Sequence, residues 1–495
     1  MPSTIKVLFL AAEAEPFIKV GGLADVAGSL PLALRCLSPS DAGGAVLDVR
    51  LVLPLYQNIH IGTEALPPVM TFPVFRRGGD LKAQVYKTAL NGMPVYFIAG
   101  NPISASDSVY STDPAADREK FAFFSLAALE LARRLDWQPD ILHANDWHTS
   151  MALYALRSRR TGHDKQPLHS VLTVHNLPYM GGDGTDVLSA YGLAPLEEAS
   201  FPPWACSQPL PLGLWSADAL VPVSPTYASE ILTPAFGCGL ETFLQSRAGA
   251  ITGILNGLDT ATWDPAKDEA LAANFTAEEL SARATNKAAL QKQLGLEPDP
   301  CIPLLASIGR MDHQKGLDIT LTALPQLGDR PWQFVLLGTG DPALEDQARQ
   351  LQAKHPDRVR AAVRFDAPLG HLIYAGADLF LMPSRYEPCG LAQMIAMRYG
   401  CLPLGRATGG LKDTIREGET GFLFQEPNAA SMLEALERAL STYAHQKEWK
   451  KLQRSAMGKD FSWPRSARQY AMIYHSLLSQ QRHEKSVATI PNSKI

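Results

Sequence analysis

The chain has 495 residues, of which 46% are hydrophobic and 19% are charged, so its length suits roughly two to four globular domains. This composition excludes an intrinsically disordered or collagen-like chain. The net charge is −5 and no basic block stands out, which argues against nucleic acid or an acidic membrane as the main partner.

No apolar run approaches the roughly 18 residues that a membrane-spanning helix needs, and the N-terminus lacks the pattern of a secretory signal. The cysteines are scattered and form no Cys-x-x-Cys pair, which argues against a zinc site and a disulfide framework. We therefore expect a cytoplasmic protein. The cysteines are Cys36, Cys206, Cys238, Cys301, Cys389 and Cys401.

Short runs rich in Val, Ile and Leu recur through the first half and hardly alternate with polar residues, as in strands buried on both faces. These predicted strands are 6–12, 49–54, 94–100, 140–144, 170–175 and 219–224. Between two of them, residues 119–135 carry Phe121, Phe124, Ala128 and Leu131 at helical spacing. This alternation predicts a parallel sheet covered by helices.

The second half repeats the pattern. Its predicted strands are 303–309, 334–338, 358–364, 377–383 and 400–405. A polar helical stretch that ends near Leu294 precedes them. We predict an α/β protein with two doubly wound, Rossmann-like domains that face a central cleft. The predicted parts are 1–255, 256–460, a C-terminal helix over 461–481 and a disordered tail over 482–495.

In such sheets, ligands bind beyond the carboxyl ends of the strands. The first strand is followed by Gly21-Gly22 and then by a helix expected from about Leu23. Two glycines let a ligand approach the backbone, the helix points its amide groups at that ligand, and Lys19 adds a positive charge. The alternative is an ordinary strand-to-helix turn.

Polar side chains also follow the fourth and fifth predicted strands. Asp146 and His148 could bind sugar hydroxyl groups, Trp147 could form the wall of a pocket, and His175 follows the fifth strand as a further hydrogen-bonding side chain. The alternative is that His143 and His148 cap the neighbouring helix. The local spacing does not favour a metal site.

In the second half, Arg310 and Lys315 lie on one strand-to-helix turn, where two cations could hold a diphosphate. The alternative is a surface loop with two solvated charges.

A later strand runs into Glu387, and a helix is expected from about Leu391, so the helix dipole should keep this carboxylate ionised. Cys389 has no base beside it in the sequence and is interpreted as a small buried residue. Thr408-Gly409-Gly410 begins a further helix and offers backbone donors for phosphate.

Several segments, in this order, resemble one family over residues 5–478. They are KVGGLADV, HANDWHT, TVHNLPYMG, VSPTYASEI, GILNGLDTATWDP, GRMDHQKGLD, GADLFLMPSRYEPCGL, RATGGLKDT and FSWPRSARQYAMIYHSLL. The family is that of the glycogen and starch synthases, which are retaining glucosyltransferases of the GT-B fold.

The resemblance implies ADP-glucose, or less often UDP-glucose, as donor and the non-reducing end of an α-1,4-glucan or maltooligosaccharide as acceptor, with no cofactor and no metal. It implies catalytic roles for Asp146, His175, Arg310, Lys315 and Glu387. It implies substrate contacts for Lys19, Gly21, Gly22, Asn256, Phe365, Cys389, Gly390, Thr408 and Gly409, with Phe365 stacking on the base. The final helix would pack back on the N-terminal domain.

The chain departs from related patterns at three places. Ile395 stands where glycosyltransferases outside the family carry a second Glu, which favours the glucan synthases. On the acceptor side, the segment from Asp117 to Lys120 lacks the family's Asp-Asn pair and Arg, and Leu212 replaces a Lys.

Two alternatives remain. The acceptor-side change leaves open a glucosyltransferase that makes maltose or short primers, and the fold alone leaves open an inactive glucan-binding scaffold. The intact Lys19, Arg310, Lys315 and Glu387 argue against the scaffold.

Overall fold

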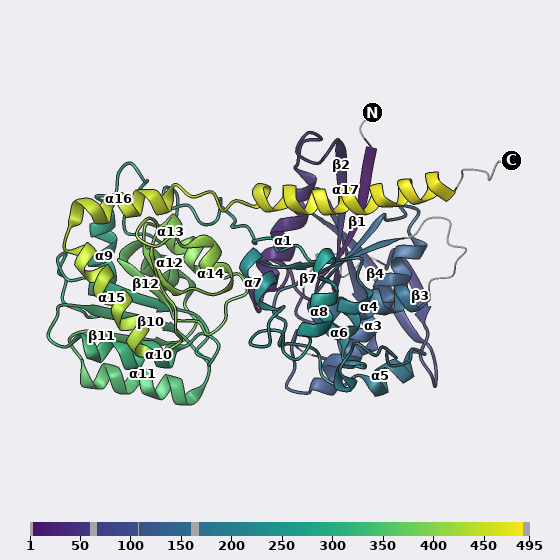
Figure 1. The fold of residues 1–495 in the computed structure, drawn as a ribbon, viewed down its shortest axis with the longest axis horizontal. Coiled ribbons are helices and arrows are strands. Elements are labelled where there is room, and N and C mark those ends of the chain that lie inside the picture. The colour runs from purple at the N-terminus through teal and green to yellow at the C-terminus, as the bar shows by residue number, and fades with distance from the viewer. Residues whose placement is uncertain (1–2, 60–66, 107, 160–167, 489–495) are drawn as a thin grey trace. The chain divides into compact units, whose positions relative to one another are not determined.

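The computed structural model describes residues 3–59, 67–106, 108–159 and 168–488, which form two compact α/β units (Figure 1). The first unit comprises the chain up to Val223, Ala228–Gly257 and the part from Trp463 onward. The second unit comprises Ser224–Tyr227 and Leu258–Ser462. Across the described ranges, no helix combines the length and the apolar character that a membrane span requires.

The described residues of the first unit build an eight-stranded sheet in the order β3-β4-β5-β2-β1-β6-β7-β8. The pairings from β5 to β8 are parallel, while β4 runs antiparallel to both β3 and β5. The strands are β1 (Ser3–Leu10), β2 (Ala45–Pro54), β3 (Met70–Val74), β4 (Leu81–Leu90), β5 (Met93–Ala99), β6 (Ile141–Asn145), β7 (His169–Val174) and β8 (Ala219–Pro222).

The two antiparallel strands are absent from the sequence prediction. Along β3 and the first half of β4, buried residues alternate with more exposed ones, so neither strand forms a continuous apolar run. Asn91 and Gly92 join β4 to β5 with φ values of 48° and 79°, the backbone that a two-residue hairpin loop requires.

Ten helices of three or more residues belong wholly to the described part of this unit. They are α1 (Gly22–Arg35), α2 (Asn101–Ser104), α3 (Pro114–Arg134), α4 (Asp146–Ser158), α5 (Thr185–Ala190), η1 (Pro203–Ala205), α6 (Pro209–Ser216), α8 (Glu241–Ser246), η2 (Ala248–Ala250) and α17 (Trp463–Ala488). A further helix, α7 (Pro225–Glu230), starts in the segment grouped with the second unit.

Helix α17 packs along α1, as Figure 1 shows in yellow and purple. The buried Tyr474 hydroxyl lies 2.7 Å from His143 Nδ1, and the other ring nitrogen of His143 lies 2.7 Å from Thr173 Oγ1. The predicted disorder from residue 482 is wrong up to Ala488, because the helix continues to that residue. Residues 489–495 lie outside the described part.

The second unit has six parallel strands in the order β11-β10-β9-β12-β13-β14. They are β9 (Leu304–Ile308), β10 (Gln333–Gly338), β11 (Val359–Val363), β12 (Leu379–Met382), β13 (Leu402–Arg406) and β14 (Phe422–Phe424). Its helices are α9 (Arg283–Gln293), α10 (Leu317–Ala323), η3 (Leu324–Leu327), α11 (Pro342–Lys354), α12 (Ala367–Gly376), α13 (Ala392–Arg398), α14 (Gly409–Thr414), α15 (Ala429–Tyr443) and α16 (Gln446–Met457).

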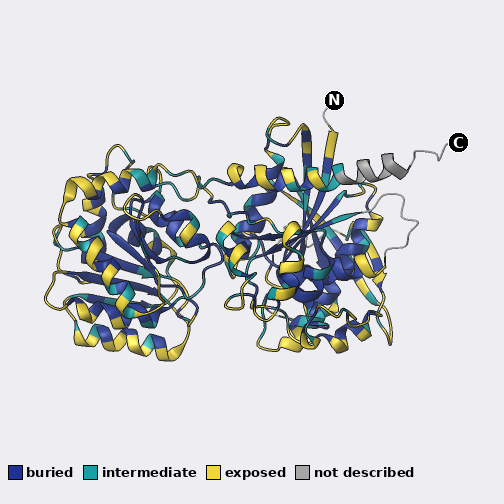
Figure 2. Ribbon diagram, in the orientation of Figure 1, coloured by how far each residue is buried: buried dark blue, intermediate teal, exposed yellow. Residues whose placement is uncertain are grey.

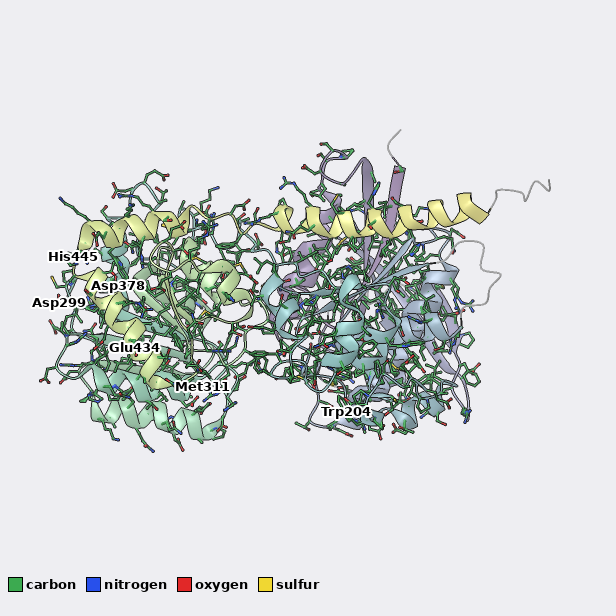
Figure 3. The ribbon with its side chains drawn as sticks, viewed as in Figure 1. Trp204, Asp299, Met311, Asp378, Glu434 and His445 are labelled. Carbon is green, nitrogen blue, oxygen red and sulfur yellow. The ribbon has the colours of Figure 1, made fainter. Side chains whose placement is uncertain are left out.

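The strands of both units are mostly buried, whereas many helices expose one side to solvent (Figure 2). The polar helical stretch predicted before Leu294 is shorter than expected, since regular helix begins only at Arg283. In the core of the second unit, Lys287 Nζ lies 2.8 Å from Asp378 Oδ2, which also accepts the Leu304 amide. Asp378, labelled in Figure 3, thus ties α9 to the starts of β9 and β12.

When only the parallel strands are counted along the chain, both sheets have the order 3-2-1-4-5-6, in which the first parallel strand lies beside the fourth. The order of connection reverses between β1 and β6 in the first unit and between β9 and β12 in the second. In open parallel sheets, such reversal points are where ligands bind, at the carboxyl ends of the strands. The segments that follow these four strands therefore define the places to examine.

Candidate functional site

In the first unit, the turn that follows β1 is closed by a carboxylate. Glu13, only 1% exposed, accepts hydrogen bonds through Oε2 from the amides of Val20 (2.5 Å) and Gly21 (3.0 Å). Glu13 therefore occupies these two amides and fixes the turn on which the predicted site residues Gly21 and Gly22 lie.

Lys19, on the same turn, is bound to two carboxylates. Its Nζ lies 2.9 Å from Glu15 Oε2 and 2.7 Å from Asp25 Oδ1, and its side chain is 46% exposed. A phosphate that binds Lys19 must therefore compete with both carboxylates.

Asp146 follows β6 in an unusual backbone conformation. Its φ is +52°, in the left-handed region that Asp and Asn adopt more readily than most residues. Its Oδ1 accepts the amides of His175 (2.7 Å) and Asn176 (3.4 Å), which brings the ends of β6 and β7 together. Burial raises the pKa of this carboxyl to about 7, although the two amides oppose the shift. Asp146 is thus a buried group that can carry a proton near neutral pH.

His175 is held as a neutral ring. Its Nε2 lies 2.9 Å from Asn145 Oδ1, and burial lowers its pKa to about 3. Asp146 and His175, both predicted site residues, are therefore brought together at one edge of the sheet. His143 does not cap α4, because its two ring nitrogens face Tyr474 and Thr173. His148 lies inside α4, where its ring packs edge-to-face on Phe121 and at a tilt against Trp147.

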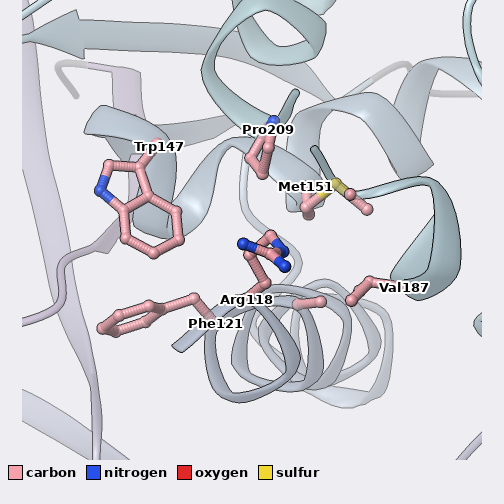
Figure 4. Close-up of a pocket in the computed structure, with 8 residues that line it drawn as sticks. Arg118, Phe121, Trp147, Met151, Val187 and Pro209 are labelled. Carbon is pink, nitrogen blue, oxygen red and sulfur yellow. The ribbon is translucent and has the colours of Figure 1, made fainter. Parts of the chain in front are cut away.

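A small pocket adjoins this edge (Figure 4). Arg118 points into it between the rings of Phe121 and Trp147 and the side chains of Met151 and Pro209. The Nε atom of Arg118 is buried and has no hydrogen-bond partner among the described residues. Buried polar atoms normally form hydrogen bonds, so this N–H group is a donor that can bind water or a substrate hydroxyl group.

Asn256, another predicted site residue, belongs to the first unit and is 7% exposed. Its buried Oδ1 also lacks a partner within the described ranges, as does Oδ1 of Asn176. A buried acceptor oxygen without a donor can accept a hydrogen bond from a hydroxyl group of a ligand.

In the second unit, an ion pair joins two of the predicted site residues. Lys315 Nζ lies 2.9 and 2.7 Å from the two carboxylate oxygens of Glu387, and Ser384 Oγ donates to Oε2 at 2.9 Å. Glu387 is 4% exposed. The Lys315 ammonium thus balances the charge of this carboxylate directly, and α13 begins at Ala392, close to the start predicted near Leu391.

Arg310 lies at the start of the segment that follows β9, and 59% of its side chain is exposed. Its Nη1 lies 3.2 Å from Asp312 Oδ2, and its Nη2 lies 3.5 Å from Gln314 Oε1. Arg310 and Lys315 are thus on one turn, but each already interacts with a carboxylate.

The turn that carries Glu387 packs directly on the start of α14. The Gly410 amide donates to the carbonyl of Glu387 at 3.0 Å. A Cβ atom at Gly409 would lie 2.0 Å from the Glu387 carbonyl oxygen, and one at Gly410 would lie 1.9 Å from that of Cys389. Glycine is therefore required at both positions. Cys389 is 4% exposed, as the sequence analysis expected.

Three further predicted residues line or flank these turns. Gly390 has a φ of +74°, and Thr408 is buried just before α14. Phe365 lies after β11 and is 91% exposed, an unusual state for a large aromatic side chain. Such a ring is available for stacking on a planar ligand.

Sequence reasoning missed three residues of the first unit: Glu13, Tyr110 and Arg118. Glu13 directly follows the first predicted strand, and an acidic residue at that strand end was the signal that could have identified it. Nothing local to Tyr110 or Arg118 indicates their positions, which depend on contacts distant in sequence.

Two family models match the chain. The model described as "Starch synthase catalytic domain" matches residues 6–246, and "Glycosyl transferases group 1" matches residues 289–456. Each match falls within one half of the chain.

Curated relatives match over nearly the full length. The glycogen synthase of Syntrophotalea carbinolica is 38% identical over 95% of this chain and 98% of that protein. The glycogen synthase of Anaeromyxobacter sp. (strain Fw109-5) is 41% identical over 96% of this chain and 99% of its own length.

Among solved structures, the catalytic domain of starch synthase IV from Arabidopsis thaliana, bound to ADP and acarbose, has a TM-score of 0.85 and 32% identity. That match covers 96% of this chain and all of the other. Sucrose-phosphate synthase from Thermosynechococcus elongatus, at 20% identity and a TM-score of 0.61, shares the fold.

Proposed function

Since the chain belongs to the glycogen and starch synthase family of glycosyltransferases, we propose that it transfers glucose from ADP-glucose to the non-reducing end of an α-1,4-glucan. The relatives are named glycogen synthases, and the Arabidopsis starch synthase structure holds ADP and acarbose, which supports these substrates. The predicted fold of two doubly wound domains is confirmed.

The observation that carries the proposal is the set of side chains at the carboxyl ends of the strands around the reversal points. In the first unit, Asp146 follows β6 and His175 follows the neighbouring β7. In the second unit, Arg310 and Lys315 follow β9, and Glu387 follows β12. An inactive scaffold has no need of a buried carboxyl with a pKa near 7 or of a bidentate ion pair with a nearly buried carboxylate.

In the proposed reaction, Arg310 and Lys315 balance the negative charge that grows on the departing diphosphate. The bond between the anomeric carbon and the diphosphate oxygen breaks, and the acceptor hydroxyl oxygen bonds to the same face of that carbon. The hydroxyl proton passes to the departing ADP, so atoms and charge balance.

Glu387 is poorly suited to be a covalent nucleophile. Lys315 binds both of its oxygens, and Ser384 adds a hydrogen bond to one of them. A carboxylate held by three hydrogen bonds attacks carbon weakly, but it can accept a hydrogen bond from a glucose hydroxyl group and offset positive charge on the reacting carbon. We therefore propose direct same-face attack rather than a glycosyl-enzyme intermediate.

Asp146 and His175 are proposed to bind the glucose being transferred. Because Nε2 of the neutral imidazole donates to Asn145 Oδ1, Nδ1 remains as an acceptor for a sugar hydroxyl group. The Asp146 carboxyl has its Oδ1 occupied by backbone amides. The remaining oxygen is the one that can contact a sugar hydroxyl group.

We also propose that the reaction needs no metal ion, since side-chain cations take the role that a divalent cation has in other nucleotide-sugar sites. Activity with ADP-glucose should be unchanged in excess EDTA. Loss of turnover that magnesium or manganese restores would contradict this proposal. A cytoplasmic location is proposed on the six cysteines, none of which forms a disulfide within the described residues.

The decisive experiment assays the purified protein with ADP-glucose and UDP-glucose, each with glycogen and with maltooligosaccharides. We expect the higher kcat/KM with ADP-glucose and chain extension of both acceptors. A higher kcat/KM with UDP-glucose would reject the donor assignment. Activity on short acceptors alone would favour a primer-forming enzyme, and glucan binding without turnover would favour a scaffold.

A further inference from the structure

Tyr110 connects the segment before α3 to the turn that follows β1. Its hydroxyl donates a hydrogen bond to Glu13 Oε1 at 3.0 Å, while Glu13 Oε2 accepts the amides of Val20 and Gly21. Burial raises the pKa of Tyr110 well above its usual value, so the hydroxyl keeps its proton and remains a donor. The shape of the Gly21-Gly22 turn thus depends on a residue about ninety positions later in the chain.

An ion pair inside the first unit fixes the segment that carries Tyr110. Lys120 is fully buried, and its Nζ donates to Asp117 Oδ1 and to the carbonyl of Val109, both at 2.7 Å. The same Nζ lies 3.2 Å from the carbonyl of Ser108. The Lys120 ammonium therefore holds the backbone on the N-terminal side of Tyr110.

Asp117 holds the other side. Its two oxygens accept the amide of Ser111 at 3.2 and 3.0 Å. Lys120 and Asp117, one turn apart on α3, thus bind the residues immediately before and after Tyr110. A buried ion pair that satisfies this many partners contributes more to a defined geometry than to net stability.

Apolar packing brings the same segments together. Ala12, Leu23 and Phe121 form a buried cluster against which Tyr110 and Trp147 pack. Ala12 precedes Glu13, and Leu23 lies in the first turn of α1, so the cluster joins both ends of the turn to α3.

From these contacts we propose that Tyr110 is a positioning residue for the Gly21-Gly22 turn, with Glu13 as the link and the Lys120–Asp117 pair as the anchor. The proposal rests on the proposed function, together with the donor contact that the family resemblance implies for this turn. The altered acceptor-side segment of this chain would then act on donor binding.

Tyr110→Phe is the sharpest test, because it removes one hydroxyl and keeps the ring. Glu13 Oε1 then loses its donor inside the protein, and the carboxylate can turn away from the amides of Val20 and Gly21. We expect the KM for ADP-glucose to rise about tenfold and the Kd for ADP, measured by calorimetry without glucan, to rise similarly, while kcat falls less than threefold.

Tyr154→Phe is the matched control. Its hydroxyl also donates one hydrogen bond within the first unit, to the Ala194 carbonyl at 2.7 Å, but it has no contact with the turn. This variant should keep wild-type KM and Kd. If Tyr110→Phe also kept both values, or if both variants lost affinity equally, the positioning role would be refuted.

Variants of the anchor test the same chain of contacts independently. Lys120→Met should raise the Kd for ADP at least as much as Tyr110→Phe, and Lys120→Arg should restore part of the affinity. Should Lys120→Met fail to fold, Tyr110→Phe and Glu13→Gln still decide the proposal. The assay of the wild type distinguishes failure of the proposed function from failure of the positioning role. Absence of turnover with ADP-glucose would reject the proposed function. An active wild type with an unaffected Tyr110→Phe variant would reject only the positioning role.

Discussion

The contact between Lys315 and Glu387 makes the two residues one chemical unit. Glu387→Gln keeps the size of the side chain but removes the charge that balances Lys315 and the reacting carbon. We expect kcat to fall at least about a hundredfold, equivalent to about 2.7 kcal/mol, with a smaller change in the Kd for ADP. Steady-state kinetics, calorimetry and a thermal melt on one preparation measure all three quantities.

Glu434→Gln is the control for this substitution, because Glu434 is exposed on α15, where it is labelled in Figure 3. A variant with both Lys315→Met and Glu387→Gln should be little worse than the poorer single variant if the two residues act together. Strictly additive losses, or an unchanged kcat in Glu387→Gln, would separate Glu387 from the reaction.

Asp146 gives the stability of the protein a specific pH dependence. Folding raises its pKa from 3.8 to about 7, so the folded protein binds this proton more tightly than the unfolded chain does. The contribution to stability is therefore fully present below pH 3.8 and is lost as the pH rises through 7.

Asp146→Asn removes this titration and suits the left-handed backbone, since Asn also tolerates a φ of +52°. We expect the melting temperature of the variant, relative to wild type, to be higher at pH 8 than at pH 5. Thermal melts of both proteins at the two pH values measure the difference. A difference that does not change with pH would contradict the raised pKa.

Contacts between residues far apart in the chain could not be predicted from the sequence. The sequence singled out Lys315 and Glu387, but the 72 positions that separate them hid their direct contact, so the two residues were given separate roles. Glu13 was missed for the same reason, because its hydrogen bonds to Val20 and Tyr110 depend on how the chain folds around the turn.

At the scale of elements, the start of α14 is placed by backbone contact with the turn that carries Glu387. Gly410→Ala puts a Cβ atom 1.9 Å from the carbonyl oxygen of Cys389, so the two segments must separate. We expect a lower melting temperature and a loss of activity greater than tenfold, measured by calorimetry and the glucan assay.

Gly249→Ala is the control for that variant. Gly249 is exposed, has nothing within 4 Å of an added Cβ atom, and should accept Ala without loss. If Gly410→Ala behaved like this control, the close packing of the turn on α14 would not matter for function.

The sequence predicted those elements whose burial is uniform. The central parallel strands were found with ends in error by at most four residues, because a strand buried on both faces is a nearly continuous apolar run. Strands β3 and β4 were missed since only one face is buried, and β14 was missed since it has three residues.

For the whole molecule, the important fact is that the first unit is discontinuous in sequence. A fragment that ends at Gly257 lacks α17, so His143 loses the Tyr474 hydroxyl and a buried surface along α1 becomes exposed. We expect this fragment to unfold at a lower urea concentration than a mixture of it with a synthetic peptide of residues 463–488.

A peptide with Ser at positions 470 and 474 is the control and should stabilise the fragment much less, because both tyrosines are buried in the intact protein. Urea unfolding followed by circular dichroism measures the midpoint for each mixture. A fragment that is equally stable with and without the peptide would show that α17 is dispensable for this unit.

The discontinuity also has a consequence during biosynthesis. The ribosome must add roughly 200 residues after Gly257 before Trp463 is made, which takes roughly 10 to 40 s at about 5 to 20 residues per second. Throughout that interval the nascent chain exposes the apolar side of α1 that α17 later covers. Chaperone binding to stalled chains should therefore persist until the last helix has left the exit tunnel, although the second unit is already complete.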